Sequence, residues 1–186
     1  MGGRNVLDAC IAHGVNRLVV TSLNAAYGYH TDNPQPLTET VPLRGNAVFS
    51  YADHQRQIEN ILEEARIDHP QLEQVVLRVA TVLGAGVENI ITALFHRPKI
   101  LAVNGSDGPV SFIWTHDLTR LLVRAIAASP LGVFDVAADG VISVHELAQI
   151  LGKPALTLTV WGLKTLLAIA HILRFTHYQP SHVSFI

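Results

Sequence analysis

The sequence predicts an α/β fold with a parallel sheet. Three apolar runs without polar alternation are typical of strands buried on both faces, and they occupy residues 15–22, 73–84 and 132–138. Stretches with apolar residues three and four positions apart lie around them and predict helices at 3–13, 51–66 and 118–128. Strands that alternate with helices in this way form a parallel sheet with helices packed on its faces.

Glycine and short polar residues predict where individual helices begin and end. Gly14 follows the first helix as a C-terminal cap, and Asp117 precedes the third helix as an N-cap. Ser143 and Glu146 form the pattern of a capping box at the start of a further helix, 143–151. Shorter elements are predicted between these: a helix at 87–96 and strands at 99–103 and 110–114.

The helix predicted at 51–66 has an apolar face and several glutamates. Its apolar face is expected to be buried and consists of Ile58, Ile61, Leu62 and Ala65. The glutamates are expected to lie mostly toward solvent, and they are Glu59, Glu63 and Glu64.

Composition excludes several classes of partner. With 49% hydrophobic residues, 15% charged residues and a net charge of -2, the chain of 186 residues has no basic surface for nucleic acid or an anionic membrane. Cys10 is the only cysteine, so an internal disulfide is impossible, and with no signal-peptide pattern the cytoplasm is the expected location. The histidines lack the tight spacing of metal ligands, so we expect no metal site.

Residues 155–175 are apolar enough to be considered as a membrane span. Lys164 and His171 would both lie within that span, and an intramembrane lysine costs about 3 kcal/mol on insertion scales. Pro154 and the β-rich run "LTLTV" instead predict a short strand followed by a helix from about Trp161. We therefore expect a helix that packs on a partner surface, with a membrane anchor as the open alternative.

Four segments resemble, in their order, one protein family. They are "GGRNVLDACIAHGVNRLVVTSLNAAYG", "SYADHQRQIENIL", "VVLRVATVLGAGVEN", and "FIWTHDLTRLLVRAI" followed by "GVFDVAADGVISVHELAQIL". The chain resembles the extended short-chain dehydrogenase/reductase family, of the nucleotide-sugar epimerase and dehydratase type. This implies the C-terminal part of a doubly wound, Rossmann-like parallel sheet with a partial substrate subdomain at 1–152, and an apolar helix and tail at 153–186.

The resemblance implies an NAD- or NADP-dependent oxidoreductase or epimerase that acts on a sugar nucleotide or a similar alcohol. Tyr51 occupies the position of the family's acid/base tyrosine. The positions that would line the nicotinamide side are Leu23, Tyr51, Gln55 and Ala80, and those at which relatives contact the sugar nucleotide are Thr81 and Asn89.

The chain departs from the family pattern in its catalytic residues. Gln55 stands where a lysine lowers the pKa of the tyrosine, and Leu23 stands where a hydroxyl binds the substrate oxygen. Because a free tyrosine has a pKa near about 10, lowering it to about 7 takes roughly 4 kcal/mol, which a neutral glutamine does not supply. Ser22 and Asn24 are expected to point to the other side of the strand from Leu23.

The family's dinucleotide-binding motif is also missing. The pattern G-x-G-x-x-G does not occur in the sequence, so we expect a chain truncated at both ends with little or no activity by itself. The alternatives are a non-catalytic remnant, a subunit that completes another chain, and a membrane-associated reductase. Arg78 is expected to orient loops beneath the cleft, or else to meet a substrate phosphate. An open sheet edge and an exposed apolar face would cause self-association.

Overall fold

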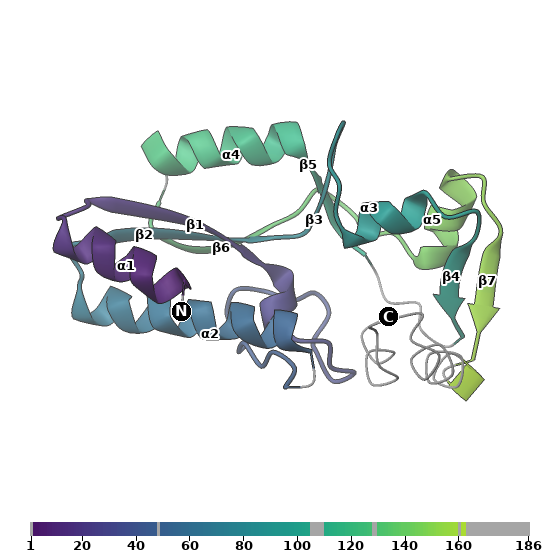
Figure 1. The fold of residues 1–186 in the computed structure, drawn as a ribbon, viewed down its shortest axis with the longest axis horizontal. Coiled ribbons are helices and arrows are strands. Elements are labelled where there is room, and N and C mark those ends of the chain that lie inside the picture. The colour runs from purple at the N-terminus through teal and green to yellow at the C-terminus, as the bar shows by residue number, and fades with distance from the viewer. Residues whose placement is uncertain (1, 48, 105–109, 128–129, 160, 163–186) are drawn as a thin grey trace. The chain divides into compact units, whose positions relative to one another are not determined.

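A computed structural model describes the chain except for residues 1, 48, 105–109, 128–129, 160 and 163–186 (Figure 1). The chain packs into two compact units, of which the first comprises Met1–Val82 and Ile113–Ala137. The second comprises Leu83–Phe112 and Ala138–Ile186. The predicted division at residue 152 is a different one and stays a prediction.

The first unit contains a parallel sheet of three strands in the order β1-β2-β6, and their bounds are Arg17–Leu23, Glu73–Val79 and Gly132–Val136. The predicted α/β fold with a parallel sheet is thereby confirmed. In the register of this sheet Ser22 lies opposite Arg78, and Arg78 lies opposite Asp135. Because partners across a sheet point to the same face, these three polar side chains form a row on one face.

Helices cover both faces of this sheet. The helices α1 (Gly2–Ala12) and α2 (Ser50–Asp68) lie on one face, and α4 (Thr115–Ala127) lies on the other (Figure 1). Val76 packs with residues of α1 and α2, whereas Val75 packs in a second cluster that includes a residue of α4. Since successive residues of a strand point to opposite faces, burial on both sides accounts for the continuous apolar run of β2.

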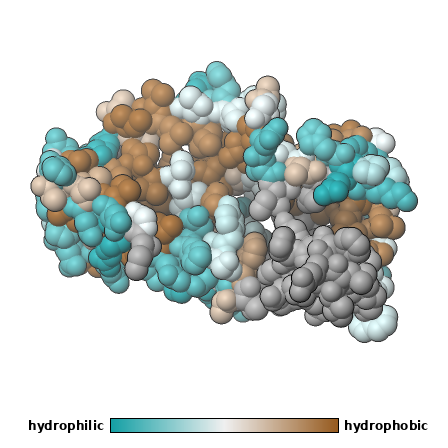
Figure 2. Space-filling model, in the orientation of Figure 1, coloured by the Kyte–Doolittle hydropathy of each residue, from teal (hydrophilic) through white to brown (hydrophobic). Residues whose placement is uncertain are grey.

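Apolar side chains also remain on the surface of the first unit. Val6 on α1 is 57% exposed, and Val123 and Ile126 on α4 are 61% and 66% exposed. Figure 2 shows apolar residues gathered over α4 and beside β1 on the viewed face. Apolar residues that are exposed singly are normal on a protein surface, but here several are exposed on the same unit.

Two of the three predicted helix caps are confirmed. Gly14 has φ 64° and lies two residues after the end of α1 at Ala12. Ser143 and Glu146 form the predicted capping box at the start of α5 (Val144–Ile150). The predicted N-cap at Asp117 is wrong, because α4 begins two residues earlier and Asp117 lies within its first turn, where the helix dipole still favours a carboxylate.

The run predicted as one strand at 73–84 is interrupted at Ala80. Its second part forms β3 (Thr81–Leu83), which pairs with β5 (Phe112–Trp114). The amide of Ala80 donates to the carbonyl of Val136 at 2.9 Å, so the chain still follows the edge of β6 at this point.

The second unit contains the parallel strands β4 (Ile100–Val103) and β7 (Ala155–Leu158), with α5 and the short α3 (Ile90–Phe95). The strand β7 confirms the predicted strand after Pro154. The predicted helix from about Trp161 lies almost entirely outside the described residues. Within the part of the chain that the structure describes, no helix is long and apolar enough to cross a membrane.

Candidate functional site

Tyr51 lies in the first turn of α2, and Gln55 follows one helical turn later. The side chain of Tyr51 is 45% exposed, and its ring contacts Phe49, with 5.9 Å between the ring centroids. Burial of the hydroxyl raises the pKa of Tyr51 above its usual value. This shift is opposite to the one that an acid/base tyrosine working near neutral pH requires.

Leu23 is the last residue of β1 and leads into the short 3-10 helix η1 (Asn24–Tyr27), against which α2 packs. Ser22 is 1% exposed and donates its hydroxyl proton to Glu59 of α2 at 2.5 Å. The hydroxyl of Ser22 is thus engaged on the α2 side of the sheet, and Leu23, the next residue of the strand, points to the other side. This agrees with the expectation that Ser22 points to the other side of the strand from Leu23.

Leu23 and Ala80 lie close together at the carboxyl end of the sheet. Leu23 pairs in register with Val79, and Ala80 follows directly after it. Ala80 is only 3% exposed. The assignment of these two residues to the nicotinamide side stays a prediction.

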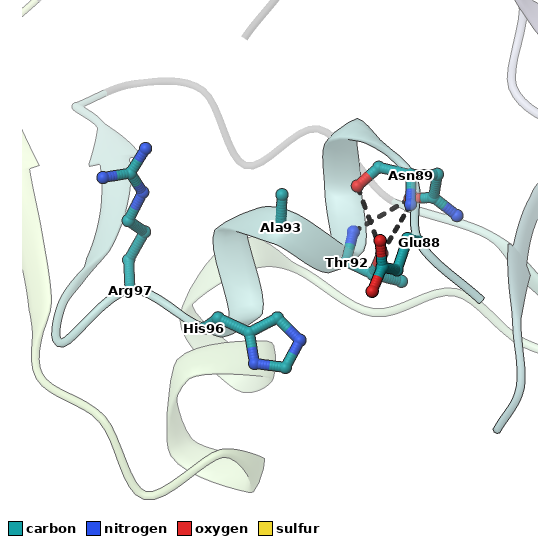
Figure 3. A pocket seen from close by; sticks show the side chains of 6 residues that line it. All are labelled: Glu88, Asn89, Thr92, Ala93, His96 and Arg97. Atoms are coloured by element: carbon teal, nitrogen blue, oxygen red, sulfur yellow. Dashed lines mark hydrogen bonds between the residues drawn. The ribbon is translucent and has the colours of Figure 1, made fainter. Parts of the chain in front are cut away.

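Of the two predicted substrate-binding residues, Thr81 begins β3 in the first unit, whereas Asn89 lies in the second unit. Asn89 caps α3: its side-chain oxygen accepts from the amides of Ile91 at 3.0 Å and Thr92 at 2.9 Å. It also lines a cavity of about 460 Å³ whose wall contains charged residues at both ends of α3 (Figure 3). The residues of this wall are Glu88, Asn89, Thr92, Ala93, His96 and Arg97.

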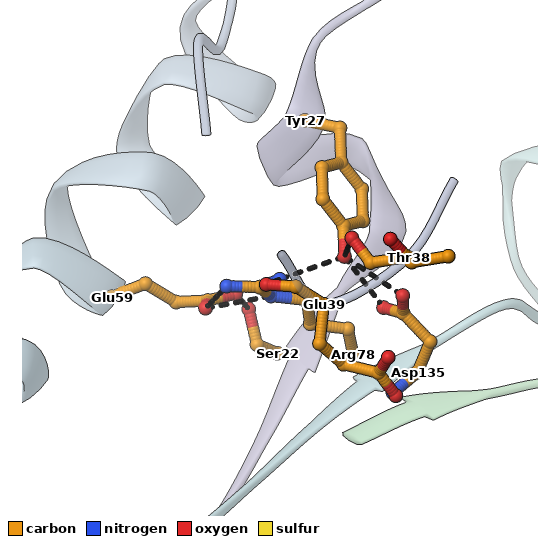
Figure 4. A network of polar contacts seen from close by, with 7 residues as sticks. All are labelled: Ser22, Tyr27, Thr38, Glu39, Glu59, Arg78 and Asp135. Carbon is orange, nitrogen blue, oxygen red and sulfur yellow. Dashed lines mark hydrogen bonds and ion pairs between the residues drawn. The ribbon is translucent and has the colours of Figure 1, made fainter. Parts of the chain in front are cut away.

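A buried polar network lies beneath the carboxyl end of β1, with Arg78 at its centre (Figure 4). The Arg78 guanidinium donates from Nε to Glu59 at 2.8 Å and from Nη1 to the Tyr27 hydroxyl at 2.7 Å. The side chains of Arg78 and Glu59 are 7% and 4% exposed. Because these contacts already occupy the guanidinium, Arg78 orients the surrounding segments, and a role in binding a substrate phosphate is not supported.

The expectation that Glu59 lies toward solvent is wrong. Glu59 accepts from both Ser22 and Arg78, so it joins α2 to β1 and β2. A carboxylate is costly to bury unless it is paired, and Arg78, standing on the helix-facing side of β2, supplies the pairing. Helical periodicity placed Glu59 correctly on the helix but did not reveal the cation that faces it.

Tyr27 links this ion pair to β6 and to the long loop that follows η1. Its hydroxyl lies 2.8 Å from an oxygen of Asp135 and 3.1 Å from the carbonyl oxygen of Thr38. Burial, and then the hydrogen bond to Asp135, raise the pKa of Tyr27 above its usual value. Burial likewise raises the pKa of Asp135. Tyr27 is 1% exposed, and its contact with Thr38 holds the loop in place.

Sequence reasoning did not single out Tyr27 or Asp135, and it misplaced Glu59. The available signal was charge inside apolar strands: Arg78 in "VVLRVAT" and Asp135 in "GVFDVAA". A charge in a strand buried on both faces requires a partner, and this rule predicts that a network exists. It does not say which of the 15 acidic residues of the chain supplies the partner.

The residues assigned to the nicotinamide side do not form a complete site for NAD or NADP. Gln55 is neutral and half-buried, Leu23 has no polar side-chain atom, and the pKa of Tyr51 is shifted upward. No turn with the Gly-rich pattern precedes a helix in the sequence. Because these residues do not fit NAD or NADP, no catalytic step is assigned to that cofactor in this chain.

Solved structures similar to this chain include sugar-nucleotide enzymes. The NAD-dependent NDP-hexosamine 5,6-dehydratase TunA, involved in tunicamycin biosynthesis, has a TM-score of 0.71 and 22% identity over 84% of this chain and 54% of TunA. The Thermus thermophilus UDP-glucose 4-epimerase in complex with NAD has a TM-score of 0.67 and 23% identity over 84% of this chain and 55% of the epimerase. At this level of identity the two structures establish the fold alone.

Sequence comparison extends the similarity over the whole chain. The uncharacterised Mycobacterium tuberculosis protein Rv0501 is 23% identical over 189 residues, which cover 100% of this chain and 50% of the relative. The chain thus spans about half the length of that curated relative. The model of the NAD-dependent epimerase/dehydratase family matches residues 1–137. With most of its length matched and its parallel sheet shared with solved epimerases and dehydratases, the chain belongs to the NAD-dependent epimerase/dehydratase family.

Proposed function

We propose that the chain carries the acid/base and substrate-binding part of an oxidoreductase or epimerase that acts on a sugar nucleotide, with its proton transfer strongly weakened. The observation that carries this proposal is Tyr51, half-exposed in the first turn of a helix that packs against η1. In this role the Tyr51 hydroxyl would exchange a proton with a sugar hydroxyl.

The weakening has two physical sources. Gln55 brings no positive charge to stabilise the phenolate of Tyr51, and Leu23 offers no hydrogen bond to the sugar oxygen. A positioned acid/base group contributes typically about 10²- to 10⁴-fold to a rate, so the loss of its activation removes a large part of catalysis.

The first test is titration of the purified chain with NADH and NADPH, followed by nicotinamide fluorescence. Saturable binding with a Kd below about 100 μM, equivalent to about 5.5 kcal/mol, would support an NAD-dependent function. Absence of binding at millimolar cofactor would contradict it for this chain alone.

The second test restores the missing groups. If the first titration shows cofactor binding, we expect the double variant Gln55→Lys and Leu23→Ser, in the presence of UDP-glucose and NAD, to gain at least about 10²-fold in the formation of enzyme-bound NADH over the unchanged chain. Adding Tyr51→Phe to the double variant serves as the control and is expected to abolish the gain. A gain that survives Tyr51→Phe would remove Tyr51 from the role proposed here.

The alternative is a non-catalytic subunit that completes another chain. It is favoured by β1, which among the described residues hydrogen-bonds to a strand on only one side, through β2. A second chain that adds a strand there would satisfy the open edge. NADH binding that appears only after such a partner is added would support this alternative.

A further inference from the structure

The middle of the loop between η1 and α2 presents acceptor oxygens to the buried polar network (Figure 4). The carbonyl oxygen of Thr38 lies 3.1 Å from the Tyr27 hydroxyl, and the side chain of Glu39 accepts from the amide of Asp135 at 2.9 Å. The carbonyl oxygen of Glu39 also lies 3.5 Å from Nη1 of Arg78. The loop is therefore held at its middle only where the network turns a hydrogen toward it.

The Tyr27 hydroxyl has one hydrogen and two neighbours that compete for it. Arg78 donates to the hydroxyl oxygen at 2.7 Å. The Thr38 carbonyl can only accept, and an ionised Asp135 carboxylate, 2.8 Å away, can also only accept. With Asp135 ionised, one of these two contacts therefore lacks a hydrogen. With Asp135 protonated, its carboxyl donates to Tyr27 and Tyr27 donates to Thr38, so every contact is a hydrogen bond.

The charges around Asp135 also favour its protonated form. Arg78 and Glu59 form an ion pair at 2.8 Å and largely offset each other, while Glu39 brings a further negative charge. In the described part of the chain, the Asp135 carboxyl makes hydrogen bonds with Tyr27 alone. Burial is the largest cause of the raised pKa of Asp135, and the charges of Glu39 and Glu59 raise this pKa further. The Tyr27 hydrogen bond and the Arg78 charge act in the opposite direction and do not cancel the rise.

We propose that Asp135 holds a proton in the folded protein and that loss of this proton releases the middle of the loop from the network. An ionised Asp135 directs a negative charge at the Thr38 carbonyl oxygen and at the Glu39 carboxylate, which weakens both contacts. Thr38 and Glu39 are exposed residues, so this part of the loop can separate from the sheet without opening the core. The same loop carries Tyr29 and leads into α2, so its release reaches the candidate site.

Amide hydrogen exchange on the full chain between pH 4 and pH 8 tests this release, together with the carbon-13 signal of the Asp135 carboxyl. The amide of Val41 donates to the Thr38 carbonyl at 2.9 Å, and the amide of Asp135 donates to Glu39, so these two amides report on the loop. We expect the carboxyl signal to titrate with a midpoint above the ordinary aspartate value of about 3.9. As Asp135 ionises, we expect both amides to exchange about tenfold faster, relative to the intrinsic rate at each pH.

Asp135→Asn supplies an amide that donates to Tyr27 at every pH, as the protonated carboxyl does. We expect this variant to keep the loop in place and to lose the pH response of the Val41 amide. A step that remains in this variant belongs to His30, which lies on the same loop and titrates in this range. Asp32→Asn is the matched control: the pKa of this exposed loop carboxyl is about 2, so we expect the pH response to be unchanged.

Three results would overturn the proposal. A carboxyl midpoint at or below about 3.9 would show that Asp135 is ionised in the folded protein. A pH response of the Val41 amide that keeps its full size in Asp135→Asn would separate the loop from Asp135. Glu39→Gln keeps an acceptor oxygen for the amide of Asp135 but removes the negative charge, so we expect it to lower the Asp135 midpoint. An unchanged midpoint would contradict the proposal even if Asp135→Asn fails to fold.

Discussion

Glu59 and Arg78 show how single residues hold this site together. Their charges lie in the core, joined at 2.8 Å, and each makes a further contact, Glu59 to Ser22 and Arg78 to Tyr27. Burying both charges is expensive, so the pair adds less net stability than its short distances suggest. Removing one partner alone strongly destabilises the fold, because it leaves the other charge buried and unpaired.

We therefore expect Glu59→Gln to lower the free energy of unfolding by about 3–5 kcal/mol, measured by urea denaturation. The matched control is Glu63→Gln on the same helix, where an exposed glutamate is expected to change stability by no more than about 0.5 kcal/mol. Equal effects of the two substitutions would show that the Arg78 pair does not hold α2 to the sheet.

Asp135 provides a prediction about pH. Burial raises the pKa of Asp135 above its value of about 3.9 in an unfolded chain, so above pH 4 the folded protein retains a proton that the unfolded chain has lost. Stability therefore falls as pH rises from about 4 through the folded pKa. Asp135→Asn removes this dependence, and we expect its stability relative to the unchanged chain to increase between pH 4 and pH 7 in urea unfolding.

Asp32 is the control, because its pKa is shifted in the opposite direction from that of Asp135. Its hydrogen bonds to Arg44 lower the pKa of Asp32 to about 2, so its contribution is present above about pH 4 and is lost as pH falls through 2. Asp32→Asn should thus leave the stability difference flat between pH 5 and pH 7. A sloping difference between pH 5 and pH 7 for Asp32→Asn, or a flat one between pH 4 and pH 7 for Asp135→Asn, would contradict the assignment.

Among the elements, the loop between η1 and α2 contributes most to the candidate site. Its two ends meet at Gly28 and Gly45, and the amide of Gly45 donates to the carbonyl of Ala26 at 3.0 Å. The middle of the loop is held by Tyr27, which lies near the carbonyl oxygen of Thr38. A segment tied at both its ends and its middle can place Tyr29 reproducibly beside α2.

Gly28→Ala should release this loop. The added methyl group would collide with the Gly45 carbonyl and force the positive φ of residue 28 on an alanine, so we expect faster amide exchange at Tyr29 and faster proteolysis between residues 28 and 46. Gly86→Ala is the control, because Gly86 also has a positive φ but has open space where the side chain would lie. If Gly86→Ala opens the 28–46 loop as much as Gly28→Ala does, the effect reflects general destabilisation and not the close approach at Gly28.

At the scale of the whole molecule we propose self-association, because among the described residues β1 pairs with a strand on one side only, and apolar residues of α1 and α4 are exposed. Sheet edges with unpaired backbone groups favour association, and so do exposed apolar side chains. We expect a concentration-dependent increase in mass in sedimentation velocity. A monodisperse monomer with one cooperative melting transition would contradict this proposal.

The pattern of residues along the chain was sufficient for the parallel α/β architecture. Continuous apolar runs such as β2 and the 3.6-residue periodicity of the helices are local consequences of two-sided and one-sided burial, and local patterns record them directly. The capping box at Ser143 and the glycine cap at Gly14 are likewise local, because their hydrogen bonds and backbone angles involve neighbouring residues. The resemblance also placed Tyr51 on a helix that packs at the end of β1.

The sequence by itself determined the order of strands and helices and the residues at helix ends, and it shows Gln55 and Leu23 at the positions where the family resemblance implies a lysine and a hydroxyl. Only the tertiary structure decided that Glu59 is buried against Arg78, that Tyr27 joins Asp135, and that Tyr29 lies beside Phe49. These pairs are 19, 108 and 20 residues apart along the chain. Charge pairing and aromatic contact act through space, so their partners emerge only when the sheet and its loops have been assembled.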